Sequence, residues 1–289
     1  MQATTFTHSG RDGTAVFVRR WLPDDDAHAS VLIAHGMGEH SGRYERFALQ
    51  LVAAGYAAYA YDHRGHGRTA VDPDQYGRFG PGGWNGLVDD LRSLGAAIDE
   101  ETRGLPRVVF AHSMGSFALQ QLLVDHSETM AAAVLSGTSA VDVLAGAISA
   151  DAPADLTLFN AAIENPRTDY DWLSRDPAEV DKYVADPMCG FGVEGAGLAT
   201  MAAEAPRLAD AQALRRIRSD LPLLLIAGAA DPLNGNLTLV DLVASRYREA
   251  GVRDVELMGY DGARHELLNE TNREQVTADV LAWLARVLP

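Results

Sequence analysis

One serine of this chain lies where a reversal of the backbone would expose its hydroxyl group. Ser113 stands between an apolar run at 107–111 and a stretch at 117–123 whose apolar residues recur at helical spacing. Gly115 has no Cβ, so a helix starting there can pack closely against the strand. The stretch departs from the G-x-S-x-G pattern of a nucleophile elbow at Ala111, where another small residue stands. The pattern predicts a nucleophilic Ser113.

A serine hydroxyl needs a base to take its proton and a carboxylate to orient that base. Eight of the nine histidines precede Ser113 or lie close to it, and only His265 comes late in the chain. His265 lies between a β-like run at 255–260 and a helical pattern at 273–287. Groups that do chemistry often occupy such strand-to-helix loops, so we expect His265 to be the base.

Three acidic residues could orient His265, namely Asp231, Asp254 and Asp261. Asp231 ends the run LPLLLIAGAAD, whose continuous apolar residues are typical of a buried central strand. The other two could simply be solvated turn residues. We prefer Asp231 because it alone directly follows an apolar strand, between the serine and the histidine.

Ester hydrolysis also needs N–H donors for the oxyanion. The residues His35-Gly36-Met37-Gly38 follow an apolar run at 31–34 and could bring backbone N–H groups close to Ser113. The expected donors are the N–H groups of Met37 and Met114. The alternative is that this loop only connects a strand to a helix.

Several longer motifs resemble the monoacylglycerol lipase and lysophospholipase-like branch of the α/β-hydrolases. They are HGMGEHSGRY, YDHRGHGRT, AHSMG, WLSRDPAEVDKYVADPMC and ARHELLNE, in this order, and the similarity covers most of residues 14–287. The resemblance implies the same triad of Ser113, Asp231 and His265, with Met37 and Met114 as the oxyanion hole.

The same resemblance implies that Glu39, Arg43 and Tyr183 hold the glycerol or other alcohol part of the substrate. The chain departs from the family pattern at Ala111, at Ser116, where a second glycine is common, and at Leu268, where the mammalian enzyme has a histidine. The expected substrate is a small ester or monoacyl lipid, most simply a monoacylglycerol. A lysophospholipid or a simple carboxylic ester is the alternative.

Strand and helix patterns alternate along the chain. This alternation predicts a mostly parallel, doubly wound sheet, the α/β class, with the active-site loops at the carboxyl ends of the strands. The expected strands are 4–8, 14–22, 31–34, 57–61, 108–111, 133–136, 223–227 and 255–260.

Residues 139–220 interrupt this alternation, since some eighty residues separate two core strands and prolines divide several helix-like pieces. We interpret them as a helical cap inserted between the core segments 1–138 and 221–289. A subdomain that only stabilises the fold is the alternative. The apolar residues expected to line an acyl channel are Leu144, Ile148, Leu156, Leu158, Phe159, Ile163 and Leu198.

The composition limits the partners of the chain. Its 289 residues carry a net charge of −16, which disfavours nucleic acid and anionic membranes. No apolar run reaches the ~20 residues of a membrane span, and residues 1–13 do not resemble a signal peptide. A lone Cys189 excludes an intrachain disulfide and favours a reducing, cytoplasmic location. We expect no metal or cofactor, and interpret His63 and His66 as loop-packing residues.

Two other functions fit the same fold class. A haloalkane dehalogenase or epoxide hydrolase would have an aspartate at the elbow, where this chain has Ser113. A non-catalytic ligand-binding scaffold would not need a serine, a histidine and an acid in the right order. We therefore expect an enzyme.

Overall fold

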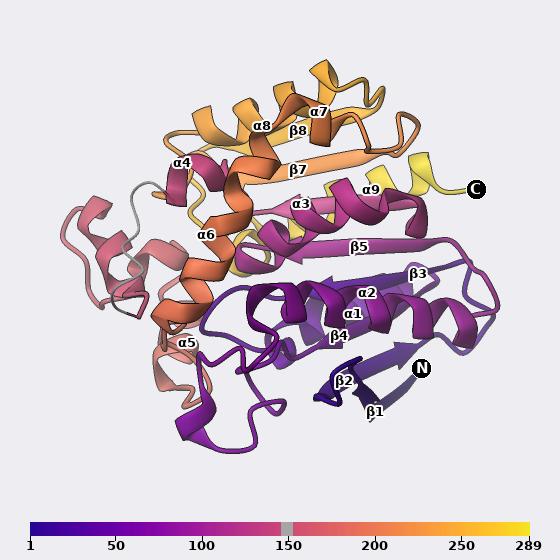
Figure 1. Cartoon of the computed structure of the whole chain (residues 1–289). Helices are drawn as coiled ribbons and strands as arrows, with labels where there is room; N and C mark the ends of the chain where they lie inside the picture. Colours follow the sequence, from indigo (N-terminus) through magenta and orange to yellow (C-terminus); the bar gives the residue numbers. More distant parts are fainter. Residues whose placement is uncertain (146–152) are drawn as a thin grey trace.

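A sheet of eight strands runs through the centre of the molecule (Figure 1). The computed structural model describes residues 1–145 and 153–289. The strands are β1 (Gln2–Ser9), β2 (Ala15–Leu22), β3 (Ala29–Ala34), β4 (Tyr56–Tyr61), β5 (Arg107–His112), β6 (Ala132–Ser136), β7 (Leu223–Gly228) and β8 (Val255–Tyr260). Every strand expected from the sequence is confirmed, and the α/β class with it.

Burial explains why these segments are strands. The strands from β3 to β7 are buried along their whole length, as continuous apolar sequences require in a parallel sheet covered on both faces. The edge strand β1 instead alternates between exposed and half-buried residues. The central strands therefore form the rigid part of the sheet.

The strand order is β1-β2-β4-β3-β5-β6-β7-β8. The pairs β1–β2 and β2–β4 are antiparallel, and all the others are parallel. Because β4 and β5 lie on opposite sides of β3, the direction of winding changes there. Such a switch point opens a crevice at the carboxyl ends of the flanking strands, here after Ala34 and His112.

Helices cover both faces of the sheet. They are α1 (Glu45–Ala53), α2 (Gly83–Glu101), α3 (Met114–His126), α4 (Val141–Ala145), α5 (Pro177–Ala185), α6 (Gly195–Ala209), α7 (Ala211–Leu214), α8 (Thr238–Glu249) and α9 (Arg273–Val287). Neighbouring strand residues point to opposite faces. Accordingly, Ile33 packs in one core cluster with α1 and α9, and Leu32 packs in the other with α2, α3 and α8.

The chain between β6 and β7 makes a long excursion that contains α4 to α7 and, among the described residues, no strand of the sheet. In Figure 1 α4, α5 and α6 lie at the carboxyl ends of the strands, whereas α7 lies beside α8. Ion pairs tie the excursion to the rest of the molecule. Arg207 of α6 binds Asp125 of α3 at 2.7 Å, and Glu179 of α5 binds Arg46 of α1 at 2.9 Å. No helix in the described parts of the chain has the length and hydropathy to cross a membrane.

Three buried histidines pack together behind the loop that follows β3. The ring of His35 lies 4.3 Å from that of His63 and 5.2 Å from that of His66, between centroids. Within the described residues, Nδ1 of His63 and Nε2 of His66 have no hydrogen-bond partner. Burial lowers the pKa of His63 to about 3 and that of His66 to about 4. Both rings are therefore neutral in the folded protein at neutral pH.

These histidines should make the fold sensitive to acid. The unfolded chain binds protons below about pH 6.5 and the buried rings do not, so each buried ring should cost up to ~1.4 kcal/mol of unfolding free energy per pH unit. For His66 this loss should begin as the pH falls below about 6.5 and end near its folded pKa of about 4. Urea unfolding at a series of pH values measures the slope.

A variant of His66 can show how much of the pH dependence of the unfolding free energy comes from this ring. The His66→Asn variant keeps a donor for the Arg64 carbonyl oxygen, which Nδ1 of His66 contacts at 3.0 Å, and should have a smaller acid slope. The control is His126→Asn, since that ring is 40% exposed. An unchanged slope in His66→Asn would contradict the prediction.

Candidate active site

Ser113 occupies a strained turn between β5 and α3. Its backbone has a φ of +50° and a ψ of −120°, which few residues other than glycine adopt. Its N–H donates to the carbonyl oxygen of Ser136 at 2.8 Å, and its side chain does not cap the helix. The hydroxyl group is therefore not used to cap the helix, and Ser113 lines the wall of a cavity.

Gly115 explains how this turn fits. A Cβ at this position would lie 2.6 Å from the carbonyl oxygens of Ala34 and His35, so only glycine lets α3 approach β3 this closely. Ala111 is fully buried in β5, where its small side chain takes the first position of the motif. The substituted Ser116 donates from its hydroxyl group to the carbonyl oxygen of Ser113 at 2.6 Å.

His265 is held by Asp231 at the ends of β7 and β8. Nδ1 of the histidine lies 2.7 Å from Oδ2 of the aspartate, and both side chains are buried. The other carboxylate oxygen, Oδ1, accepts from the N–H of Leu233 at 2.9 Å. A Cβ at Gly228 would lie 2.2 Å from the carbonyl oxygen of Ala263, so this glycine lets the two loops meet. The carboxylate fixes the tautomer with Nδ1–H and leaves Nε2 to act as the base.

The electrostatics of His265 come from two opposing causes. Burial disfavours the charged ring, but the negative charge and hydrogen bond of Asp231 outweigh it and raise the pKa of His265 above its ordinary value. Neutral rings complete its surroundings. His112 lies 4.7 Å and Trp172 4.9 Å from it, between ring centroids. Burial, then the neighbouring His265, lowers the pKa of His112 to about 3.

The two rival acids lie elsewhere. Asp254 directly precedes β8, so it lies at the amino end of that strand, away from His265. It binds Arg286 at 2.9 Å. Asp261 follows β8, but its side chain is exposed. Of the three acids, the structure pairs Asp231 with the histidine.

The loop after β3 lies against the elbow. A Cβ at Gly36 would be 3.1 Å from Cβ of Ser113, so the two backbones are close. Glu39 holds this loop, since its Oε1 accepts from the N–H of Gly36 at 2.6 Å and from the hydroxyl group of Tyr44 at 2.7 Å. Met37 and Met114, the residues expected to supply N–H donors, line the same cavity as Ser113.

Glu39, Arg43 and Tyr183 lie close together, and they mainly bind one another and the loop after β3. Arg43 binds Oε2 of Glu39 at 2.8 Å and both carboxylate oxygens of Glu266, and its guanidinium lies 4.8 Å from the centroid of the Tyr183 ring. Burial raises the pKa of Glu39, whereas Arg43 outweighs burial at Glu266 and lowers its pKa to about 2. Arg43 does not line the large cavity, and the other three residues do.

The hydroxyl group of Tyr183 links the excursion to the loop after β3. It donates to the carbonyl oxygen of Gly38 at 2.9 Å and accepts from the N–H of Gly190 at 3.2 Å. The N–H of Gly190 also donates to the same Gly38 oxygen at 3.0 Å. Gly38 has a φ of +64°, and a Cβ there would lie 2.4 Å from the Phe191 carbonyl oxygen, so glycine is required.

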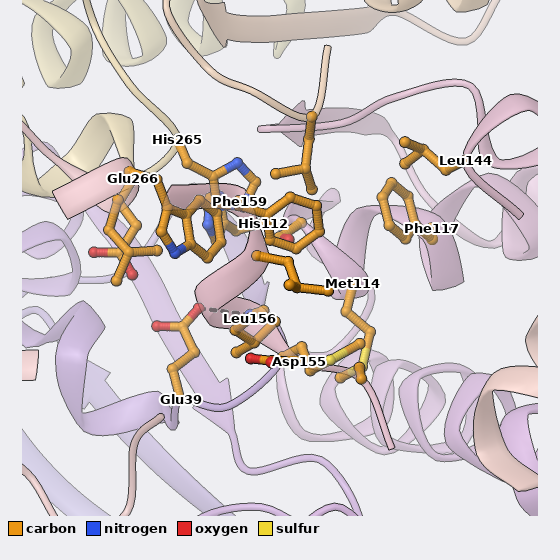
Figure 2. A pocket seen from close by; sticks show the side chains of 18 of the residues that line it. Glu39, His112, Met114, Phe117, Leu144, Asp155, Leu156, Phe159, His265 and Glu266 are labelled. Carbon is orange, nitrogen blue, oxygen red and sulfur yellow. Dashed lines mark hydrogen bonds between the residues drawn. The ribbon is translucent and has the colours of Figure 1, made fainter. Parts of the chain in front are cut away.

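The cavity measures about 500 Å³, and Figure 2 shows that its two ends differ. Glu39 and Glu266 lie at one end, near His265, whereas Phe117 and Leu144 lie at the other. The apolar lining residues are Met37, Met114, Phe117, Leu144, Leu156, Leu158, Phe159, Leu173, Met201 and Leu233. The cavity therefore has a polar end and an apolar end, with Ser113 and His265 in its wall.

The expected acyl-channel residues divide into three groups. Leu144, Leu156, Leu158 and Phe159 line the cavity. Ile163 packs beside it, and Leu198 packs in the core next to the sheet. Ile148 lies outside the described residues. Sequence reasoning missed Phe117, Trp172, Leu233 and Glu266, although the position of Glu266 next to His265 could have indicated it.

Within the described residues, one group could offer three ligand atoms to a metal ion, namely His40, Asp186 and Cys189. Nδ1 of His40 accepts from the N–H of Gly42, so Nε2 carries the proton and donates to Asp186 at 2.9 Å. Burial raises the pKa of the Cys189 thiol. Protons therefore occupy two of the three ligand atoms.

Known proteins are similar to this chain in sequence. A profile of the family described as "Serine aminopeptidase, S33" matches residues 25–272. The monoacylglycerol lipase of Mycolicibacterium smegmatis is 34% identical over 98% of both chains. Human monoglyceride lipase is 30% identical over 90% of this chain and 82% of its own.

Solved structures agree on the fold. A thermostable carboxyl esterase from Bacillus coagulans superposes with a TM-score of 0.88 over 100% of both chains, at 24% identity. The family match and the two lipase sequences lead to the same assignment, and the chain belongs to the serine aminopeptidase S33 family of α/β-hydrolases.

Proposed function

We propose that this serine hydrolase cleaves monoacylglycerol-type esters through an acyl-enzyme on Ser113. The observation that carries the proposal is the elbow serine and the buried His265–Asp231 pair in the wall of a cavity with one apolar and one polar end. An acyl chain suits the first end and a small alcohol suits the second. The names of the relatives from Mycolicibacterium smegmatis and human support the same substrate class.

The chemistry proceeds in two halves. Nε2 of His265 takes the proton of the Ser113 hydroxyl group as the oxygen attacks the ester carbonyl carbon, and returns it to the leaving alcohol. Water then repeats the sequence on the acyl-enzyme and releases the acid. Asp231 keeps the ring oriented and stabilises its charged form. The N–H groups of Met37 and Met114 stabilise the oxyanion in both halves.

The excursion has its own part in the proposal. Residues 139–220 would act as a cap between the core segments 1–138 and 221–289, because Leu156, Leu158 and Phe159 close one wall of the cavity. Glu39, Arg43 and Tyr183 would hold the alcohol directly or by fixing the polar end. We also propose a cytoplasmic location, which the lone Cys189 supports.

Removal of the nucleophile or of the base should abolish most activity. Ser113→Ala and His265→Ala should each reduce kcat on the order of 10³-fold or more, and the double variant should lose little beyond either one, because the residues act as a unit. Ester hydrolysis and fluorophosphonate labelling by the purified variants measure this. Ser93→Ala, in α2, is the control. More than a tenth of wild-type activity in Ser113→Ala would refute the nucleophile.

The orienting acid can be tested against its rivals. Asp231→Asn should lower kcat by on the order of 10²–10⁴-fold, since it favours the wrong tautomer of His265. Asp254→Asn and Asp261→Asn change the same charge away from the histidine and should have little effect. Steady-state kinetics on the three variants decides the assignment, and a larger defect in either rival would overturn it.

Recognition of glycerol should appear as a difference between two substrates. Glu39→Gln and Tyr183→Phe should lower kcat/KM for a monoacylglycerol about 5- to 100-fold more than for the methyl ester of the same acid, because only the former loses alcohol contacts. The decrease in kcat/KM for the methyl ester measures the part of the effect that comes from a disturbed loop after β3, which Glu39 and Tyr183 also hold. Tyr170→Phe, whose hydroxyl group binds the Gly190 carbonyl oxygen outside the cavity, is the control. Equal losses on both esters would leave only a general carboxylesterase.

A further inference from the structure

The charged residues that line the large cavity all have the same sign. They are the carboxylates Glu39, Asp155 and Glu266, and among the described lining residues there is no lysine or arginine. The other titratable groups that line the cavity are His265, the neutral His112 and the neutral Tyr183. A substrate that enters this cavity therefore meets an excess of negative charge.

The guanidinium of Arg43 does not remove this excess. Its NH1 binds both Glu39 and Glu266, and its NH2 binds Glu266 at 2.6 Å, so one cation is shared between two carboxylates. The polar partners of Glu39 are all donors, from Gly36, Arg43 and Tyr44, which suits the ionised carboxylate. Arg43 thus has little capacity to bind a further anion.

Asp155 adds an unpaired charge at the mouth. Its Oδ1 accepts from the N–H and the hydroxyl group of Thr157, and no ion pair within the described residues neutralises it. Figure 2 places Asp155 between the polar and the apolar ends of the cavity. An anionic alcohol in the cavity would therefore share it with Asp155 as well as with Glu39 and Glu266.

The sequence on both sides of Asp155 also lacks cationic side chains. From residue 127 to residue 166 the chain contains no lysine, arginine or histidine. It does contain five acids, which are Glu128, Asp142, Asp151, Asp155 and Glu164. Arg246 neutralises Asp142 from outside the segment. No residue of this segment could therefore neutralise an anionic substrate.

We infer that the site selects its ester by the charge of the alcohol: uncharged and cationic alcohols are accepted, and alcohols that carry a phosphate are rejected. This rests on the ester hydrolysis proposed above and decides between its alternatives, because monoacylglycerols are neutral whereas lysophospholipids carry a phosphate near the ester. Repulsion is strongest near Glu39 and Glu266, which are buried and therefore poorly screened, whereas solvent partly screens the exposed Asp155. The net charge of −16 opposes the approach of anions as well.

Four hexanoyl esters test the inference, because esters this short can be used as monomers, which excludes effects of an aggregate surface. The first pair is 1-hexanoylglycerol and its 3-phosphate, and the second is hexanoylcholine and its uncharged isostere 3,3-dimethylbutyl hexanoate. Wild-type kcat/KM should be on the order of 100-fold lower for the phosphate than for the glycerol ester. It should be several-fold higher for choline than for its isostere, and both ratios should shrink at high ionic strength.

Two matched pairs of variants locate the charges. Asp155→Asn should reduce the discrimination against phosphate about threefold. Asp25→Asn removes the same charge from the loop before β3, at the opposite edge of the sheet, and should leave the ratio unchanged. Leu158→Arg places a cation at the cavity mouth, where the side chain is 69% exposed, and should raise activity on the phosphate ester. Leu158→Gln should not.

The possible failures are distinguishable. Hydrolysis of the phosphate and glycerol esters at similar rates, or a preference for the neutral isostere over choline, would overturn the charge selection alone. If Leu158→Arg and Leu158→Gln change the phosphate rate equally, the cavity charges do not set the selection and the inference is wrong. Failure to cleave even 1-hexanoylglycerol would refute the proposed function and this inference with it.

Discussion

The site depends on one conformational constraint, the left-handed backbone of Ser113. A non-glycine residue in such a conformation costs on the order of 1–3 kcal/mol, so the surroundings must hold it in place. The contact of Gly115 with the carbonyl oxygens of Ala34 and His35 and the hydrogen bond from Ser113 to Ser136 do so. These contacts join three adjacent strands, β3, β5 and β6, at their carboxyl ends. The strain is therefore borne by the most deeply buried part of the sheet.

A second level of organisation is electrostatic. His265 lies among groups with opposite effects, since Asp231 favours its charged form while burial favours its neutral form. The neutral rings of His112 and Trp172 fill the space around it without adding charge. At the polar end, the carboxylates of Glu39 and Glu266 share a single guanidinium, that of Arg43. The charge of Asp231 thus orients His265. The rings that pack against the histidine are neutral, and the charged residues of the cavity lining are carboxylates.

The strands could be predicted because continuous apolar runs are a local property of the sequence, and the candidate catalytic residues come shortly after three of these strands. The run before Asp231 is apolar throughout, and parallel strands bring their following loops to one edge, so Ser113, Asp231 and His265 could be expected to converge.

The lining of the cavity could not be predicted in the same way. Helical spacing gives the apolar face of Leu198 but not the element that this face contacts, and the structure places Leu198 against the core. Glu39 was expected at the alcohol, whereas its contacts with Gly36 and Tyr44 depend on how residues 36–44 fold back on themselves.

The carbonyl oxygen of Gly38, in the loop after β3, accepts from both Tyr183 and Gly190 of the excursion. Because of this shared acceptor, the two segments depend on each other structurally. A recombinant that received a foreign excursion alone would leave Gly38 without its two donors, and the loop next to the nucleophile would lose its support. Residues 36–44 and 183–190 therefore form one structural unit, although almost 140 residues separate them in the sequence.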